Sequence, residues 1–241
     1  MPPASDGKAR SRVALIIPTL NEEESIGPVL AEIPRVHVDR IIVADSGSCD
    51  ATAAVAARGG ADVLSVGRGY GRACLAGAEA ARDAQILVFM DGDGADDPAS
   101  IPQLIGPIES GLHDFVIGSR TRGAAADGSM GWHQRLSGHA LGLAMQLVYG
   151  IRYTDMCAFR AIRRDTLLAL DMRETTYGWN LEMQMRAARA KLRVLEIPVD
   201  NRHRVGGESK VAGSLRGTIK ASTRIIATFF RVALARPNCD A

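Results

Sequence analysis

Short runs of apolar residues alternate with helix-like patterns through the first half of the chain. In the helix-like segments the apolar residues recur with the period of an α-helix, whereas the runs between them are continuous and rich in Val and Ile. Continuous apolar runs are typical of strands in a parallel sheet with both faces covered. The predicted strands are 13–17, 40–44, 63–66, 86–90 and 115–118, and the predicted helices are 26–33, 51–58, 71–82 and 101–108. We therefore predict an α/β fold with a mostly parallel central sheet flanked by helices.

The pattern changes after a Gly- and Ala-rich segment at 123–131, which is predicted to be a loop. Beyond it we expect helices at 136–149 and 179–190, extended segments at 158–162 and 194–199, and a polar loop at 202–210. The chain then divides into a flexible N-terminus (1–12), one α/β domain (13–212) and a C-terminal amphipathic helix with a tail (213–241).

The C-terminal helix, predicted at 215–234, separates basic from apolar side chains. At about 100° per residue the basic ones form one stripe and the apolar ones a separate arc. The stripe comprises Arg216, Lys220, Arg224 and Arg231, and the arc comprises Leu215, Ile219, Ile226, Phe229 and Phe230. Three interpretations are open: the helix packs its apolar face on its own domain, forms a contact in an oligomer, or docks on an anionic membrane surface without spanning it.

Composition narrows the class of protein only modestly. The 241 residues are 46% hydrophobic and 23% charged, with a net charge of +2, as in an ordinary soluble globular protein. Residues 186–236 hold twelve Lys or Arg and three Asp or Glu, which suits a phosphate or an anionic surface. The aromatic content of 5% argues against a base-stacking surface, so nucleic acid is not an expected partner.

Cysteine usage and hydropathy indicate where the protein works. The four cysteines are scattered without a CxxC pair, which fits a reducing compartment. Residues 1–12 contain no apolar leader, and the longest uncharged stretch, 136–151, is too short to span a membrane. We expect a cytoplasmic protein, with or without peripheral attachment to the inner face of the membrane.

The most informative chemistry lies at the carboxyl end of the predicted strand 86–90. Asp91 and Asp93 follow it directly, and in extended backbone two residues separated by one point the same way. Gly92 between them permits close approach by a ligand. Two carboxylates on one side suit Mg²⁺ or Mn²⁺ bound to a diphosphate, although an ordinary Asp-Gly turn has the same sequence.

Several segments on strand ends resemble glycosyltransferase family 2. In chain order they read PTLNEEESI, ADSGSCDAT, FMDGDGADDP and VIGSR, followed by WHQRLS, CAFRA, YGWNLEMQMRAA and RVGGESK. Within that family they are similar to the branch of dolichyl-phosphate mannosyltransferases and polyprenyl-phosphate glycosyltransferases. The resemblance covers about residues 13–220 and implies the GT-A fold of nucleotide-diphospho-sugar transferases.

The resemblance also implies roles for individual residues. The donor nucleotide-sugar would be bound by Pro18, Thr19, Asn21, Glu22, Asp45, Asp91, Gly92, Asp93, Arg204 and Lys210. Asp91 and Asp93 would hold the divalent metal. The acceptor phosphate would be bound by Arg120, Arg135 and Ser137, and the residues most directly involved in catalysis would be Asp93, Arg120 and Arg135.

The chain departs from the family pattern at three positions. Leu20 stands where relatives commonly have Tyr, Ser46 where they often have a second Asp, and Ala95 where they often have Gln. Asp96, Asp97 or water could complete the metal shell in place of that Gln. The departures leave two features of the donor undecided: which sugar it carries, and whether its nucleotide is UDP or GDP.

The lack of an obvious general base bears on the kind of acceptor. A hydroxyl acceptor needs a general base, whereas a phosphate is already an anion and needs positioning by guanidinium groups. Arg120 and Arg135 without an obvious base favour a polyprenyl phosphate, and Asp155 and Glu182 remain candidate bases for a hydroxyl. We predict an inverting transferase of this kind, with no prediction of oligomeric state.

Three alternatives remain at this stage. The first is a family 2 glycosyltransferase with a soluble small-molecule acceptor. The second is a dinucleotide-binding oxidoreductase that uses the Gly-rich turn 67–71, although that turn follows the third predicted strand rather than the first. The third is a non-catalytic module that binds a nucleotide or a membrane through the basic C-terminal segment.

Overall fold

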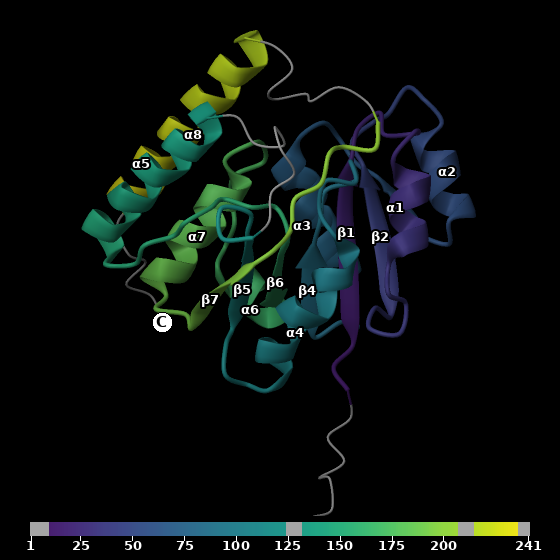
Figure 1. The fold of residues 1–241 in the computed structure, drawn as a ribbon, viewed down its shortest axis with the longest axis horizontal. Helices are drawn as coiled ribbons and strands as arrows, with labels where there is room; N and C mark the ends of the chain where they lie inside the picture. The colour runs from purple at the N-terminus through teal and green to yellow at the C-terminus, as the bar shows by residue number, and fades with distance from the viewer. Residues whose placement is uncertain (1–9, 124–131, 207–214, 236–241) are drawn as a thin grey trace, which may run out of the picture.

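A seven-stranded sheet forms the centre of the molecule (Figure 1). The computed structural model describes residues 10–123, 132–206 and 215–235, with the backbone alone at 132–140 and 215–221. The strand order is β3-β2-β1-β4-β6-β5-β7, and all neighbours are parallel except that β6 runs antiparallel to β4 and β5. The strands are β1 (Val13–Thr19), β2 (Arg40–Asp45), β3 (Asp62–Ser65), β4 (Ile86–Phe89), β5 (Phe115–Ser119), β6 (Arg160–Arg163) and β7 (Val194–Pro198).

Helices cover the sheet on both faces. The helices are α1 (Ile26–Glu32), α2 (Thr52–Arg58), α3 (Tyr70–Ala80), the 3₁₀ helix η1 (Pro98–Ser100), α4 (Ile101–Glu109), α5 (Trp132–Tyr149), α6 (Arg164–Ala169), α7 (Trp179–Arg189) and α8 (Leu215–Leu234). α1 contacts α2 and η1. α3 contacts α7, and α7 also contacts α5 and α8. α3 approaches the sheet closely, since a Cβ at Gly77 would lie 2.5 Å from the side chain of Ile16.

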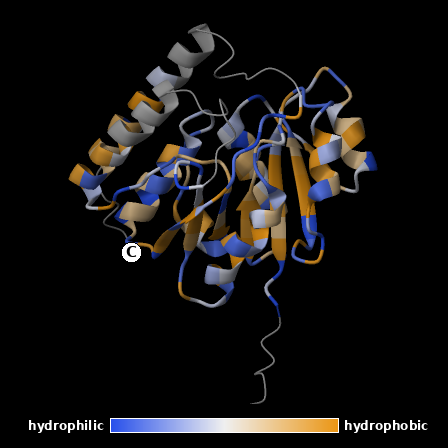
Figure 2. Cartoon of the chain, viewed as in Figure 1, coloured by the Kyte–Doolittle hydropathy of each residue, from blue (hydrophilic) through white to orange (hydrophobic). Residues whose placement is uncertain are grey.

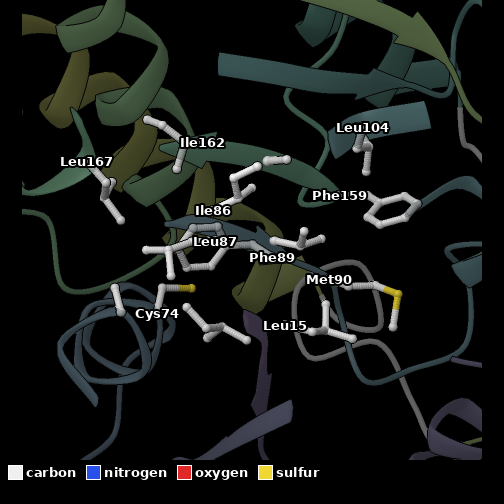
Figure 3. Close-up of a cluster of buried hydrophobic side chains, with 14 of the residues drawn as sticks. Leu15, Cys74, Ile86, Leu87, Phe89, Met90, Leu104, Phe159, Ile162 and Leu167 are labelled. Atoms are coloured by element: carbon white, nitrogen blue, oxygen red, sulfur yellow. The ribbon is translucent and has the colours of Figure 1, made fainter. Parts of the chain in front are cut away.

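The core lies where the sequence predicts it, along the central strands. Leu15, Ile16 and Ile86 are fully buried, and Figure 3 shows the close-packed side chains of β4 and their neighbours. Figure 2 shows the same concentration of hydrophobic positions in the sheet. Burying a Leu or Ile side chain contributes roughly 1.5–3 kcal/mol, so these runs supply much of the drive to fold. The predicted α/β class with a mostly parallel sheet is confirmed.

Two features of the sheet differ from the expected pattern. β3 is an edge strand and is largely exposed, so the expectation of strands covered on both faces is wrong for it. The segment expected to be extended at 158–162 forms β6, which inserts between β4 and β5 in the antiparallel direction. The apolar pattern cannot distinguish the two directions, because a buried central strand is apolar in either. The short helix α6 follows β6 immediately and was not predicted.

Helix α8 meets the domain with a face that lies between the predicted basic stripe and the predicted apolar arc, because Ile225, Phe229 and Val232 pack against the core. Arg224 and Arg231, whose side chains are 50% and 42% exposed, lie at the edge of this face and bind the buried Glu174, and Thr228 between them is 1% exposed. Ile226 and Phe230, from the predicted apolar arc, are each 57% exposed. The two arginines therefore stabilise the attachment of α8, and the idea of this part of the stripe as a free basic face is wrong. The side chains of Leu215, Arg216, Ile219 and Lys220 lie outside the described residues.

The architecture leaves one edge of the sheet for ligands. β1 and β4 are neighbours, and the chain crosses over from β1 toward β2 in one direction and from β4 toward β5 in the other. In open α/β sheets such a switch point forms a crevice at the carboxyl ends of the strands. No described helix is long and apolar enough to cross a membrane.

Candidate active site

The carboxyl ends of β1, β2 and β4 bring together most of the predicted donor-binding residues. Pro18 and Thr19 end β1, in register with Ala44 and Asp45 at the end of β2. Asp91, Gly92 and Asp93 follow β4, which pairs with β1 on its other side. Thr19, Glu22, Asp45 and Asp93 are all at least nine-tenths buried. Carboxylates kept dry in this way interact strongly with any cation that enters.

Asn21 and Asp45 organise the loops that form this edge. Asn21 has a left-handed φ of 51°, and its backbone N–H donates to Ser48 Oγ at 2.9 Å. Its side-chain oxygen accepts from the backbone N–H of Cys49 at 2.8 Å. Asp45 accepts from the backbone N–H of Ser48 at 3.1 Å and binds its hydroxyl. The two side chains therefore tie the loop after β1 to the loop after β2, beside a pocket lined by residues 21–25 and Asp50.

Three aspartates lie close together at the end of β4. Asp93 accepts a hydrogen bond from the backbone N–H of Ala95 at 2.9 Å, and Asp96 accepts from the backbone N–H of Asp91 at 3.4 Å. Burial and the negative charge of Asp93 raise the pKa of Asp91 to about 6. Burial and the charges of both neighbours raise the pKa of Asp96 to about 8. The negative charge of the three carboxylates is therefore only partly offset when no cation is bound.

The raised pKa of Asp96 predicts a pH-dependent stability of the metal-free protein. An acid whose pKa is raised on folding holds a proton that the unfolded chain loses near pH 4, so stability falls as pH rises from about 4 to about 8. Asp96→Asn mimics the protonated form. In EDTA, its gain in Tm over wild type should be larger at pH 8 than at pH 5 by at least about 3 °C, since each pH unit between the two pKa values is worth about 1.4 kcal/mol, or about 3–5 °C. Equal differences at the two pH values would contradict the prediction.

Arg204 brings a guanidinium group onto this cluster. Its Nη1 lies 2.6 Å from Asp93 Oδ2, and its Nη2 lies 3.3 Å from Glu22 Oε1. The backbone beside it runs along the loop after β4, since Val205 N–H donates to the Asp93 carbonyl and Arg202 N–H to that of Ala95. Arg204 thus neutralises Asp93 in the metal-free protein. Binding of a cation to Asp93 would release this guanidinium toward the phosphates of a donor.

Arg120, at the end of β5, is held by Asp155. Its Nε and Nη2 donate to the two carboxylate oxygens at 2.8 and 2.9 Å, and its backbone N–H adds a third bond at 3.0 Å. Burial alone would raise the pKa of Asp155, but the hydrogen bonds from Arg120 outweigh it and keep the pKa below its usual value. The bidentate pair fixes the guanidinium plane and leaves its remaining donors for an anion.

The two candidate bases for a hydroxyl acceptor are both occupied. Asp155 binds Arg120, as above. Glu182 is fully buried and accepts from the backbone N–H groups of Arg173 and Glu174 and from Arg186. Neither carboxylate is placed to receive a proton from an acceptor in this structure. The hypothesis that they act as bases is therefore not supported by their geometry.

Three predicted site residues fall outside what the structure describes. Lys210 lies in 207–214, and the side chains of Arg135 and Ser137 lie in the part of α5 where the backbone alone is described. The backbone of α5 does place positions 135 and 137 within the first two turns of that helix. Their roles stay predictions.

The residues present fit a divalent cation carried in with a diphosphate. No group of three or more His, Cys, Asp or Glu within the described ranges has the arrangement of a complete metal centre. Asp91 and Asp93 offer two hard oxygen ligands. A Mg²⁺ or Mn²⁺ ion bound to a diphosphate takes its remaining ligands from phosphate oxygens and water. Thr19 Oγ1 and Arg204 Nε are buried without a partner among the described residues, as expected beside an anionic ligand. Of the other two acids considered, Asp97 caps η1 and pairs with Arg202, so Asp96 is the one that lies at the site.

Sequence reasoning missed one residue of the site, Tyr70. Its hydroxyl donates to Asp91 Oδ1 at 3.1 Å. It lies in the Gly-rich turn 67–71 considered for dinucleotide binding. A Cβ at Gly69 or Gly71 would lie 2.4 or 2.3 Å from the carbonyl oxygens of Thr175 and Glu174, so backbone fills the space that a pyrophosphate would need. The position of the turn after a predicted strand, where ligand-binding residues gather in a parallel sheet, was the available signal.

Comparison with known proteins establishes the family. Residues 14–170 match the family model described as glycosyl transferase family 2. An uncharacterised glycosyltransferase of Mycobacterium tuberculosis is 39% identical over 214 residues, which cover 88% of this chain and 95% of the relative. The undecaprenyl-phosphate mannosyltransferase of Micrococcus luteus is 33% identical over 220 residues, which cover 86% and 90%. The polyprenol monophosphomannose synthase of Mycolicibacterium smegmatis is 30% identical over 221 residues, which cover 84% of this chain and 82% of the relative.

Solved structures agree on the fold. Glucosyl-3-phosphoglycerate synthase from Mycobacterium tuberculosis, in complex with phosphoglyceric acid, superposes with a TM-score of 0.75 at 24% identity, covering 95% of this chain and 82% of that one. The same enzyme has been solved with Mn²⁺, UDP-glucose and phosphoglyceric acid. The chain belongs to glycosyltransferase family 2 and has the GT-A fold. It is a glycosyltransferase, so the oxidoreductase and non-catalytic interpretations are wrong.

Proposed function

We propose that the protein is a metal-dependent, inverting glycosyltransferase that moves a sugar from a nucleoside-diphosphate sugar to a polyprenyl phosphate. The relatives named undecaprenyl-phosphate mannosyltransferase and polyprenol monophosphomannose synthase, at 33% and 30% identity, support this acceptor class. The observation that carries the proposal is the Arg120–Asp155 pair. This pair offers a rigid guanidinium at the carboxyl end of β5. Both candidate bases for a hydroxyl acceptor are bound to arginines, Asp155 to Arg120 and Glu182 to Arg186.

The site residues would divide the reaction between donor and acceptor. Asp91 and Asp93 would hold the metal, which neutralises the charge that develops on the departing diphosphate. Arg204 would turn from Asp93 to the diphosphate. Arg120, together with Arg135, would hold the acceptor phosphate so that one of its oxygens attacks the anomeric carbon. That carbon–oxygen bond forms as the bond to the nucleoside diphosphate breaks on the opposite side, and the configuration inverts.

The acceptor is tested by mass spectrometry of the products. The purified protein is incubated with Mn²⁺ or Mg²⁺, a panel of UDP- and GDP-sugars, and either a short polyprenyl phosphate or 3-phosphoglycerate. We expect a polyprenyl-phosphate glycoside from one donor. Transfer only to the water-soluble acceptor would replace the proposed acceptor by the small-molecule alternative. Full turnover in EDTA would remove the metal from the proposal.

A lipid acceptor also gives a role to the exposed apolar residues of α5 and α8. Both helices pack against α7 at one side of the molecule (Figure 1). In α5, Leu143, Leu147 and Val148 are exposed, and in α8, Ile226, Phe230 and Leu234 are exposed. The inner side of α5 reaches the acceptor region, because Leu141 and Met145 line a small cavity together with Asp155. These six residues, the apolar surface, would enter the membrane boundary while the acceptor phosphate stays at Arg120.

Membrane attachment is expected to be mainly apolar and to resist salt. Arg224 and Arg231 are engaged with Glu174 and Glu182, which reduces the attraction they offer to anionic lipid. Liposome flotation should therefore change little between low and high salt. The double variant Ile226→Ser and Phe230→Ser should bind at least about tenfold more weakly, because apolar area contributes about 25 cal/mol per Å².

Val36→Ser is the matched control for flotation, since Val36 is 75% exposed but lies outside the apolar surface. It should float like wild type. Flotation of wild type and the double variant to the same extent would contradict membrane docking by the apolar surface. Loss of wild-type flotation in high salt would assign the contact to basic residues instead.

A further inference from the structure

Helix α8 lies far from the metal-binding carboxylates in sequence, yet a continuous set of contacts joins it to Asp91. The first contact is the hydrogen bond from Tyr70 to Asp91. Tyr70 is the first residue of α3 and is partly buried against the core. A fixed donor on one carboxylate oxygen orients the other toward a ligand.

The position of Tyr70 depends on the turn at Glu174 and Thr175. Arg72 N–H donates to the Thr175 carbonyl oxygen at 3.1 Å. Gly69, with a φ of 138°, and Gly71 leave no space for side chains against the same backbone. The start of α3 therefore rests directly on this turn, without intervening side chains that could absorb a shift.

Helix α8 holds the turn at Glu174 and Thr175 in place. Glu174 is 2% exposed, and its carboxylate accepts hydrogen bonds from Arg224 at 3.0 Å, from Thr228 at 2.9 Å and from Arg231 at 2.9 Å. Glu182 holds the other side of the turn by accepting from the Glu174 backbone N–H at 2.5 Å. A buried carboxylate needs all of these donors, because an unsatisfied one is costly.

We propose that Tyr70 and Glu174 are positioning residues that couple the attachment of α8 to the geometry of the metal ligand Asp91. This inference rests on the proposed function, in which Asp91 binds the metal. Because α8 also carries half of the apolar surface, a force on that helix reaches Asp91 through Glu174, Thr175 and Tyr70. Contact between α8 and the membrane would thus adjust the affinity for metal and donor.

The test measures Mn²⁺ affinity from the electron paramagnetic resonance signal of free Mn²⁺. UDP or GDP is present throughout, and the one chosen is the nucleotide that the wild-type protein binds more tightly. Tyr70→Phe should weaken Mn²⁺ binding about tenfold, as is typical when a partner of a metal ligand is removed. Thr228→Val removes one donor to Glu174 and should weaken it about threefold, corresponding to one modest hydrogen bond. The double variant should be no weaker than Tyr70→Phe alone, since Thr228 acts through Tyr70.

Two controls separate coupling from general destabilisation. Tyr177→Phe changes a partly exposed tyrosine near the same turn and should leave Mn²⁺ affinity unchanged. Thr228→Ser keeps the hydroxyl and should restore the wild-type value. If Thr228→Val lowers Tm without changing Mn²⁺ affinity, or if Tyr70→Phe binds Mn²⁺ like wild type, the inference is overturned. If wild type binds no Mn²⁺ at all, the proposed function fails at its metal, and the inference with it.

Discussion

Asp93→Ala should lower turnover by about 10³-fold or more while the protein remains folded. Removing this carboxylate removes a metal ligand, and a metal at a departing diphosphate stabilises the transition state by several kcal/mol. Asp93 is also the partner of Arg204, at 2.6 Å, so its loss leaves Arg204 with Glu22. The fold should persist because fewer negative charges then meet at the end of β4. Turnover with the preferred donor and acceptor, together with Tm in EDTA, checks both statements.

The matched control for Asp93 is Asp97→Ala. Asp97 lies on the same loop, where it caps η1 and pairs with Arg202. Its loss should cost some stability but little turnover, because its carboxylate is engaged by the Ala99 N–H and by Arg202. Full activity of purified Asp93→Ala, or equal losses in the two variants, would show that the metal assignment is wrong.

Arg120→Ala and Arg135→Ala should raise the acceptor KM about 10–150-fold with a much smaller effect on the donor KM. Each change removes charge-assisted hydrogen bonds to phosphate, worth roughly 1.5–3 kcal/mol. Arg120 sits at the end of β5, whereas the donor residues lie at the ends of β1, β2 and β4. The acceptor constant should therefore respond far more than the donor constant, which changes only through the charge that Arg120 exerts on Asp91 and Asp96. Initial rates at varied acceptor and fixed donor, and the reverse, measure the two constants.

Arg120→Ala has a structural consequence that the experiment must separate from binding. Asp155 is 6% exposed, and an unpaired buried carboxylate can cost about 3–5 kcal/mol of stability. Arg120→Lys keeps a positive charge beside Asp155 but loses the two-pronged geometry, so it should fold better and still raise the acceptor KM. Arg122→Ala, two residues further along, removes a bond to the Glu196 carbonyl and should leave both constants unchanged. An increase confined to the donor KM would refute the assignment of Arg120 to the acceptor phosphate.

Local patterns in the sequence were sufficient to predict the sheet and the position of Asp91 and Asp93. A strand buried on both faces must be apolar at every position, so the runs ending near Ile17, Ala44 and Met90 could hardly be anything else. The residues that follow such a strand necessarily emerge at the edge of the sheet. The metal-binding pair was therefore predictable from the chain itself, although its role as a metal site remains a proposal.

Contacts between distant segments could not be predicted in this way. Arg204 and Asp93 are 111 residues apart, Arg120 and Asp155 are 35 apart, and Arg231 and Glu174 are 57 apart. A lone arginine or glutamate carries no local signal of its partner, because either is normally found in water. Only the fold decides which of them meet. For that reason Asp155 and Glu182 read as candidate bases in the sequence and prove to be partners of arginines in the structure.

The sequence by itself determined that this protein is an α/β glycosyltransferase with two aspartates at the end of a central strand, because periodicity and strand-end motifs are local properties. Only the tertiary structure decided the antiparallel direction of β6 and the inward face of α8. A helix with a basic stripe and an apolar arc can dock by either face. Here the buried carboxylates of Glu174 and Glu182 lie beneath it and require Arg224 and Arg231 as partners. Ile226 and Phe230 of the apolar arc are therefore exposed, while Phe229 of the same arc packs against the core.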